Sequence, residues 1–303
     1  MNIINVLIPI FLVLGMGALS IKARIFKADD SYIFSRYDFY IGFPILIFYS
    51  LLHTQFALIS NFPFLITNIL NLFITVILVL VVAKLFKVER KLTGVLLIGS
   101  VYGNVAYMGI PLNQLLFGAD GVSYAAIIVG IVSILALSIG IFSLEYFTDL
   151  KPNLKTIFLD MAKNPIILAV ILGIVFSALQ WKPWTPIDDF LSLVSKSASP
   201  IALFAIGMFL VRKHAMHHKG IIFALCLANL IVLPLITYGV GHFMNLSGVP
   251  FKVSVLEAAM PLAATNFVLA QKYKIGEEII ANAIIISTLV SIVTIGGLIF
   301  SLR

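Results

Sequence analysis

The sequence predicts an all-α integral membrane protein with ten transmembrane helices in two inverted five-helix repeats. Three observations support this prediction: the composition, the distribution of basic residues among the loops, and matched prolines in the two halves. Of the 303 residues, 61% are hydrophobic and only 11% are charged, whereas a soluble domain has about 25% charged residues. The chain is therefore expected to lie in a membrane.

Ten apolar runs follow one another along the chain, and several exceed the roughly 18 residues that a spanning helix needs. They cover residues 3–21, 32–52, 65–82, 92–117, 124–146, 165–179, 190–211, 221–243, 253–273 and 279–300. The turn residues Gly118-Ala119-Asp120-Gly121 separate the fourth run from the fifth. We expect a first repeat at 1–148, a short cytoplasmic linker at 149–164 and a second repeat at 165–303.

Lys and Arg are distributed unequally between alternate loops. One set of loops holds most of the 20 basic residues, whereas the opposite set holds only Lys182, Lys252 and Arg303. Cytoplasmic loops of membrane proteins carry the excess of Lys and Arg. We therefore expect both termini to lie outside, in a multi-pass protein of the plasma membrane, the bacterial inner membrane.

Prolines interrupt the apolar runs at corresponding positions of the two halves. Pro44 and Pro200 each begin a Pro-Ile-x-x-Phe sequence, and Pro111 and Pro261 lie in the fourth and ninth runs. Inverted repeats with helices interrupted at matching positions are typical of secondary transporters with a site at the membrane midplane. We expect helices four and nine to break at their prolines. Second half-helices that start directly after each proline would turn their N-termini toward an anion.

Polar residues gather around these two prolines. The candidate substrate-binding residues are Asn104, Gly109, Pro111, Asn113, Pro261, Thr265 and Asn266. An asparagine amide can both donate and accept hydrogen bonds. The alternative is that these side chains form interhelical hydrogen bonds that hold two kinked helices together.

Three charged residues lie deep inside the apolar runs. Lys196 is a candidate substrate-binding residue, as counter-ion for a carboxylate, or else it snorkels or pairs with Asp38, Asp189 or Glu257. Asp38 and Glu257 are candidate coupling residues for a proton or ion, because a desolvated carboxyl group can take up a proton. Glu257 could instead pair with Lys252.

Five short sequences carry a similarity that covers essentially the whole chain: Gly103-Asn104 with Gly109-Ile110-Pro111-Leu112, Lys163-Asn164-Pro165, Ala-Ser-Pro-Ile-Ala-Leu-Phe-Ala-Ile-Gly at 198–207, Ala-Ala-Met-Pro at 258–261, and Leu-Ala-Gln-Lys-Tyr at 269–273. In these the chain resembles the auxin efflux carrier family, whose bacterial members are often assigned to malate, malonate or other organic anions. The resemblance implies a core domain (65–146 plus 221–300), in which broken helices four and nine cross, and a scaffold domain (1–64 plus 165–220). It also implies elevator-type alternating access, and it makes a homodimer through the scaffold reasonable.

The expected function is secondary transport of a small organic anion, such as a dicarboxylate or an auxin-like carboxylate. A sodium-coupled carrier of the bile-acid or antiporter type and a non-transporting membrane ligand sensor are the alternatives. No Gly-rich nucleotide loop, zinc-binding His-Glu-x-x-His sequence or Gly-x-Ser-x-Gly elbow is present in the sequence. We therefore expect no enzyme activity, no metal site, no nucleic-acid partner and no cofactor beyond a coupling proton or sodium ion.

Overall fold

The computed structural model describes residues 3–54, 61–147, 158–159, 162–211 and 216–302, and these residues are almost entirely helical. The chain divides into two compact units. Unit 1 comprises Met1–Asn61, Ala106–Gly130 and Lys163–Lys213, and unit 2 comprises Phe62–Val105, Ile131–Ala162 and His214–Arg303. Most of the predicted linker at 149–164 lies outside the described residues.

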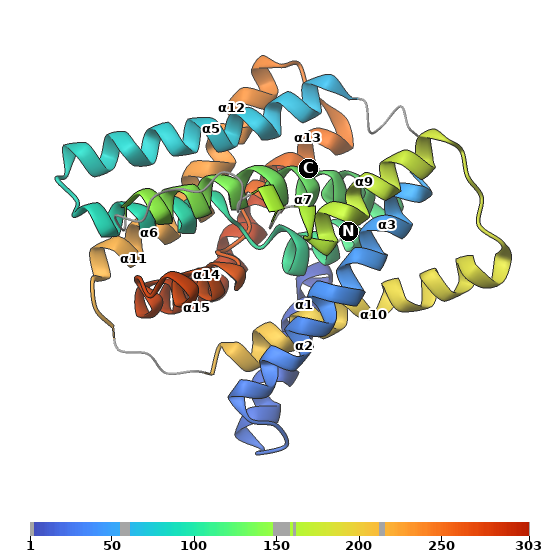
Figure 1. Cartoon of the computed structure of the whole chain (residues 1–303), viewed down its shortest axis with the longest axis horizontal. Helices are drawn as coiled ribbons and strands as arrows, with labels where there is room; N and C mark the ends of the chain where they lie inside the picture. The colour runs from blue at the N-terminus through green and yellow to red at the C-terminus, as the bar shows by residue number, and fades with distance from the viewer. Residues whose placement is uncertain (1–2, 55–60, 148–157, 160–161, 212–215, 303) are drawn as a thin grey trace. The chain divides into compact units, whose positions relative to one another are not determined.

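Unit 1 is built around a close crossing of its first and last long helices. Its elements are α1 (Ile3–Lys22), a short 3-10 turn (Ala28–Asp30), α2 (Ser31–Tyr37), α3 (Phe43–Leu52), α9 (Pro165–Ala178) and α10 (Thr185–Phe209). Helix α1 lies against α10 (Figure 1). A methyl group added at Gly17 would collide with the carbonyl oxygen of Phe204, and one added at Gly207 would collide with that of Leu14. Small residues let two helix backbones approach closely, as is typical of packing in membranes.

Unit 2 contains more of the long helices. Its elements are α5 (Phe62–Leu85), α6 (Arg90–Val101), α11 (Lys219–Leu227), α12 (Leu233–Phe243), α13 (Gly248–Ala258), α14 (Thr265–Tyr273) and α15 (Glu277–Ser301). Helices α5 and α12 lie side by side (Figure 1), and α13 packs against both. The amide of Asn68 on α5 donates a hydrogen bond of 2.9 Å to the hydroxyl of Ser254 on α13. Buried aliphatic residues such as Val95, Val255 and Ile280 form the core of the unit.

Helix α7 (Ile110–Phe147) begins in unit 1 and ends in unit 2. It bends sharply at Gly118, where the backbone angles are φ 62° and ψ −141°. This conformation favours glycine, because glycine has no Cβ. The predicted separation of the fourth and fifth apolar runs at residues 118–121 is confirmed as this bend.

Three five-residue π-helical segments share one sequence feature. They are η2 (Asp38–Gly42), η3 (Val105–Gly109) and η4 (Ala228–Val232), and each is followed by one residue and then a proline: Pro44, Pro111 and Pro234. Proline has no N–H to donate to the carbonyl four residues earlier. A wider turn before the proline accommodates this lost bond, and π-bulges of this kind are frequent at functional sites.

Five helices among the described residues are long and apolar enough to cross a membrane. They are Phe62–Leu85, Val105–Phe147, Thr185–Phe209, Lys219–Phe243 and Glu277–Ser301, and shorter apolar helices cover Ile8–Lys22 and Pro165–Ala178. The all-α, membrane-spanning class is supported by these helices. The ten-span inverted repeat and the division into core and scaffold stay predictions.

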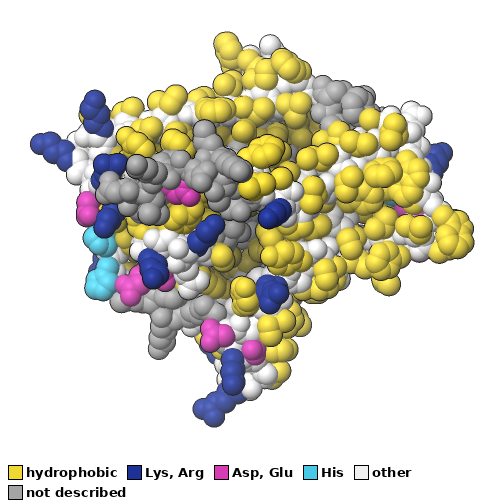
Figure 2. All heavy atoms as spheres, viewed as in Figure 1, with side chains coloured by type: hydrophobic (Ala, Val, Ile, Leu, Met, Phe, Trp, Pro, Cys, Tyr) yellow, Lys and Arg dark blue, Asp and Glu magenta, His cyan; other side chains and the backbone are white. Residues whose placement is uncertain are grey.

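The outward faces of these helices are apolar. Figure 2 shows hydrophobic side chains over much of the face in view, and Leu12, Phe62, Leu193, Leu235 and Val293 are among the most exposed. Large contiguous apolar surfaces are rare on soluble monomers. Such surfaces suit contact with lipid chains.

Candidate substrate site

Two helices of unit 2 are interrupted and meet at the interruption. Helices α6 and α13 both end there, and the extended residues that follow them pair through an antiparallel bridge between Gly103 and Leu262. A Cβ added at Gly103 would lie 3.4 Å from the carbonyl oxygen of Met260. This is an ordinary van der Waals distance, so the Cα of Gly103 lies close to the backbone of Met260.

Backbone hydrogen bonds close this interruption. The amide of Asn104 donates to the carbonyl of Pro261 at 2.7 Å, and the amide of Ala263 donates to the carbonyl of Tyr102 at 3.1 Å. Unpaired backbone groups are costly in hydrocarbon, so non-helical chain at membrane depth must be satisfied in this way. The side chain of Asn104 is buried beside the bridge.

The position of the interruption before α7 differs from the prediction. The sequence predicts a break at Pro111 and a half-helix that starts directly after it, whereas the chain is non-helical at Tyr102–Asn104 and α7 already begins at Ile110. Proline fits the first turn of a helix, because its missing N–H would have no helical partner there. The predicted break at Pro261 agrees better with the structure, because Pro261 lies inside the non-helical stretch 259–264.

Thr265 and Asn266 open helix α14 and face the interruption. The side-chain amide of Asn266 donates to the carbonyl of Tyr102 at 2.9 Å, and the Tyr102 hydroxyl hydrogen-bonds with Thr265 and Ser133. Asn266 is completely buried, and its side-chain oxygen has no hydrogen-bond partner among the described residues. The bond from the amide nitrogen to Tyr102 fixes the side chain, and its oxygen stays available as a hydrogen-bond acceptor.

A second asparagine, Asn229, was missed by the sequence analysis. It lies in η4, is completely buried, and donates from its amide to the carbonyls of Gly99 (2.9 Å) and Leu225 (3.0 Å). Its oxygen also has no partner within the described part of unit 2 and lies 3.9 Å from the Cβ position of Gly103. The sequence does carry a signal for it, namely a single amide in an apolar run five residues before Pro234.

Glu257, one candidate coupling residue, lies in the last turn of α13 and is 2% exposed. Its suggested structural partner, Lys252, makes no ion pair in the part of the chain that the structure describes. The alternative in which these two residues pair is therefore not observed.

Asp38, the other candidate coupling residue, lies in unit 1 at the start of η2. It is completely buried, and neither carboxyl oxygen has a hydrogen-bond partner among the described residues. A Cβ at Gly42 would lie 2.6 Å from one of these oxygens and 3.2 Å from the Cβ of Ala198. The carboxyl group thus lies against Gly42, on the side of η2 that packs on α10.

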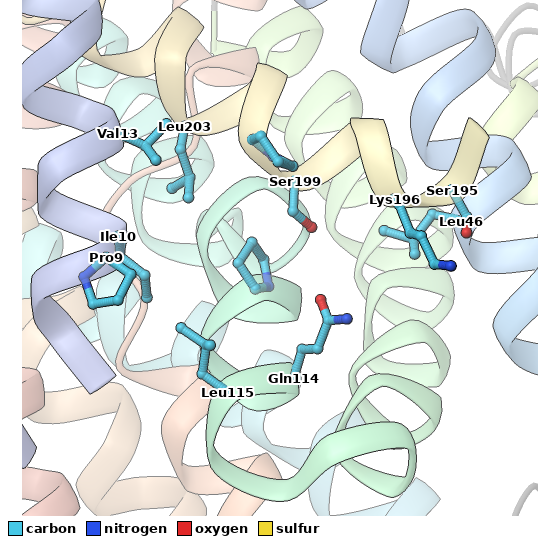
Figure 3. Close-up of a pocket in the computed structure, with 12 residues that line it drawn as sticks. Pro9, Ile10, Val13, Leu46, Gln114, Leu115, Ser195, Lys196, Ser199 and Leu203 are labelled. Carbon is cyan, nitrogen blue, oxygen red and sulfur yellow. The ribbon is translucent and has the colours of Figure 1, made fainter. Parts of the chain in front are cut away.

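Lys196 and Pro111, both predicted site residues, line one pocket of unit 1. Its volume is about 230 Å³, and its polar lining comes from Gln114, Ser195, Lys196 and Ser199. Figure 3 shows Ser199 and Gln114 directed toward the same space from different helices. Lys196 forms no ion pair with Asp38, Asp189 or any other described residue.

Gly109 and Asn113 bond to each other in unit 1. The side-chain amide of Asn113, which is completely buried, donates to the carbonyl of Gly109 at 3.0 Å. The predicted site residues therefore divide into two groups. Asn104, Pro261, Thr265, Asn266 and Glu257 belong to unit 2, and Gly109, Pro111, Asn113, Lys196 and Asp38 belong to unit 1.

The sequence matches that of a known family over nearly its whole length. A sequence profile described as "Membrane transport protein", that of the auxin efflux carriers, matches residues 2–152 and 150–299. The chain belongs to the auxin efflux carrier family. Members of this family are membrane transporters and not enzymes.

Curated relatives of the family align with nearly the whole chain. A protein from Rhizobium meliloti (strain 1021), whose name proposes a malonate transporter, is 23% identical over 100% of this chain and 96% of its own length. An uncharacterized transporter of Methanocaldococcus jannaschii is 27% identical over 96% of this chain and 95% of its own. Auxin efflux carrier component 5 of Arabidopsis thaliana is 22% identical over 96% and 94%. The similarity thus extends along nearly the whole length of this chain and of these three relatives.

Proposed function

We propose that the chain is a secondary transporter that moves a small organic anion by elevator-type alternating access. The names of the relatives, one for malonate and one for auxin, support an anion as the substrate. The observation that carries the proposal is the bridged interruption at Gly103 and Leu262, with buried amide side chains around it. Interrupted helices are where secondary transporters place their substrate and coupling ions.

In this proposal the polar groups of unit 2 contact the substrate and its coupling ion. The side-chain amide of Asn104 supplies a donor for an anion, and the N-terminus of α14 adds the partial positive charge of a helix dipole. The oxygens of Asn229 and Asn266 accept hydrogen bonds from a hydroxyl group or a water molecule. Amide nitrogens that are already bonded to backbone carbonyls hold both oxygens in place.

Asp38 is the proposed proton carrier of unit 1, and Glu257 is that of unit 2. An ionised carboxylate is very costly to bury without a cation or donors. Asp38 has neither among the described residues. In this proposal the carboxyl group is therefore neutral while it is buried, and it exchanges its proton in another state of the transport cycle. The proposed location is the bacterial inner membrane, with both termini outside and a homodimer formed through the scaffold.

A sodium-coupled carrier is a second candidate. The observation that favours it is the pair of buried amide oxygens without partners, because oxygen atoms are the preferred ligands of hard cations. Replacement of sodium by choline on both sides of a vesicle separates the two candidates. Transport that stops in choline supports sodium coupling, and transport that continues supports proton coupling.

The test of the site is uptake of carboxylates into proteoliposomes by the Asn104→Ala variant. We expect uptake to fall about 10-fold or more, because a hydrogen bond to a charged group contributes roughly 1.5–3 kcal/mol. The matched control is Gln271→Ala, which removes an exposed amide from α14 and is expected to leave uptake unchanged. Uptake by Asn104→Ala at the wild-type rate would remove Asn104 from the site.

A further inference from the structure

A groove of unit 2 follows α11 and η4 and has α15 as its other wall (Figure 1). All the residues that line it belong to this one unit. Its volume is about 420 Å³, and its lining consists mainly of large apolar side chains such as Ile222, Leu227, Ile286 and Val290. Ligand pockets of proteins usually begin at roughly 300 Å³, so the groove is large enough for a ligand with a long apolar body.

The groove has the length of one lipid leaflet. Lys219 is the first residue of a helix long and apolar enough to cross a membrane, so the groove starts where this span starts. Its wall on α11 and η4 extends from Lys219 to Ile231, which is about 18 Å at the rise of an α-helix. One half of the hydrocarbon core of a bilayer is about 15 Å thick. The groove therefore matches an acyl chain that descends through a single leaflet.

A cation lies at the end of the groove where the span starts. Lys219 is the one charged residue among the described residues that line the groove, and its ammonium has no ion pair or hydrogen bond with any of the residues that the structure describes. Glu278 of α15 does not line the groove, and its carboxylate lies 3.9 Å from the imidazole of His217. The loop before Lys219 is predicted to be cytoplasmic, and the cytoplasmic leaflet carries anionic lipids. An anionic headgroup therefore complements this end of the groove.

A second helix fits this groove less well than an acyl chain does. Helices that associate inside a membrane approach each other through small residues, as α1 and α10 do at Gly17 and Gly207. None of the described residues that line the groove is Gly, Ala or Ser. Bulky side chains such as Phe223, which is 68% exposed, hold a second backbone at a distance, whereas a flexible acyl chain packs between them.

We infer that unit 2 binds one anionic phospholipid in this groove, with the phosphate at Lys219 and one acyl chain between α11 and α15. The inference goes beyond the proposed function, because this lipid is a bound component of the protein and is not the transported anion. It differs from the other lipids around the protein in two respects. One molecule binds to each chain, and the charge of the headgroup selects it.

Native mass spectrometry of the purified full-length protein tests this inference. The delipidated protein in detergent is titrated with phosphatidylglycerol or with phosphatidylcholine of the same acyl chains, and the bound lipid molecules are counted. We expect the first phosphatidylglycerol to bind about 5-fold more tightly than the first phosphatidylcholine, which is the preference that one lysine gives for an anionic lipid surface. Further molecules of both lipids should bind more weakly and without preference.

Two pairs of variants assign the tight binding to the groove. Lys219→Gln should remove the preference for phosphatidylglycerol, whereas Lys84→Gln, at the end of α5 in the same unit and outside the groove, should keep it. Val290→Trp fills the groove and should abolish the first, tight binding event for both lipids. Val293→Trp places the same side chain at an exposed position of α15 that does not line the groove, and it should bind lipid like the wild type.

Equal affinity for the two lipids overturns the inference, and so does a preference for phosphatidylglycerol that survives Lys219→Gln. A wild-type dimer that Val290→Trp dissociates without a change in lipid binding also overturns it and indicates a second copy of the chain as the occupant. If Val290→Trp does not fold, the comparison of Lys219→Gln with Lys84→Gln decides. These measurements do not depend on transport, so their failure leaves the proposed function in place, and absence of carboxylate flux leaves the lipid site in place.

Discussion

A single buried carboxyl group, that of Asp38, is the most unusual residue of unit 1. It sits in a π-helical segment, is completely buried, and has no partner for either oxygen among the described residues. Native proteins rarely keep such a group, because an unsatisfied buried polar atom costs about 1–3 kcal/mol and more when charged. Its presence within η2 therefore fits a group that works in transport, and not one that stabilises the fold.

Asp38→Asn is expected to uncouple transport from the proton gradient. The amide has the same shape but carries no exchangeable charge, so the variant should fold and should still exchange carboxylate across the vesicle membrane. Accumulation driven by an imposed pH gradient should fall to the level measured without a gradient. Both rates are measured by isotope flux in proteoliposomes.

Asp189→Asn is the control for this prediction, because Asp189 is exposed on α10 of the same unit. It should keep gradient-driven accumulation. If Asp38→Asn also keeps it, Asp38 is not the proton carrier, and Glu257 is the remaining candidate.

Helices in a membrane are held together by close backbone contact, whereas helices in water are packed by the hydrophobic effect. Gly17 on α1 and Gly207 on α10 face carbonyl groups of the opposite helix. Between lipid-exposed helices, such contact and the van der Waals packing around it stabilise the pair. Loss of either glycine should therefore separate α1 from α10.

Gly17→Ala is expected to lower the free energy of unfolding by about 1–3 kcal/mol, because the added methyl group overpacks the crossing. Gly15→Ala is the matched control on the same helix, since no atom lies within 4 Å of its Cβ position. It should be neutral or stabilising by about 0.5–1 kcal/mol, because alanine favours the helix. Thermal unfolding in detergent measures both, and equal stability of the two variants would contradict the close crossing.

For the whole molecule, composition and apolar runs were sufficient to predict a helical membrane protein, whereas transport was predicted from the matched prolines and the family resemblance. A span needs a minimum length of apolar residues, so helices such as α5, α10 and α15 follow directly from the sequence. The interruption before α7 was placed wrongly, since proline is accepted in a first helical turn and the non-helical residues pair at Gly103 with Leu262. Long-range geometry of this kind has no local signature.

The residues of the site could be predicted only in part. Asn104, Asn266 and Lys196 stand out because polar groups are rare in spans. Asn229 was missed, because one amide in an apolar run is equally typical of an interhelical hydrogen bond. That Gln114 lines the same pocket as Ser199 depends on how α7 packs against α10, which spacing along the chain does not reveal.

The most direct test of the central claim is solute counterflow by the purified protein alone. Liposomes that contain only this chain are loaded with an unlabelled carboxylate, and the same compound, labelled, is added outside without ATP. A secondary transporter of organic anions predicts transient accumulation of label that depends on the internal carboxylate. Binding of carboxylates by the protein without any counterflow would contradict the account and would indicate a membrane ligand sensor instead.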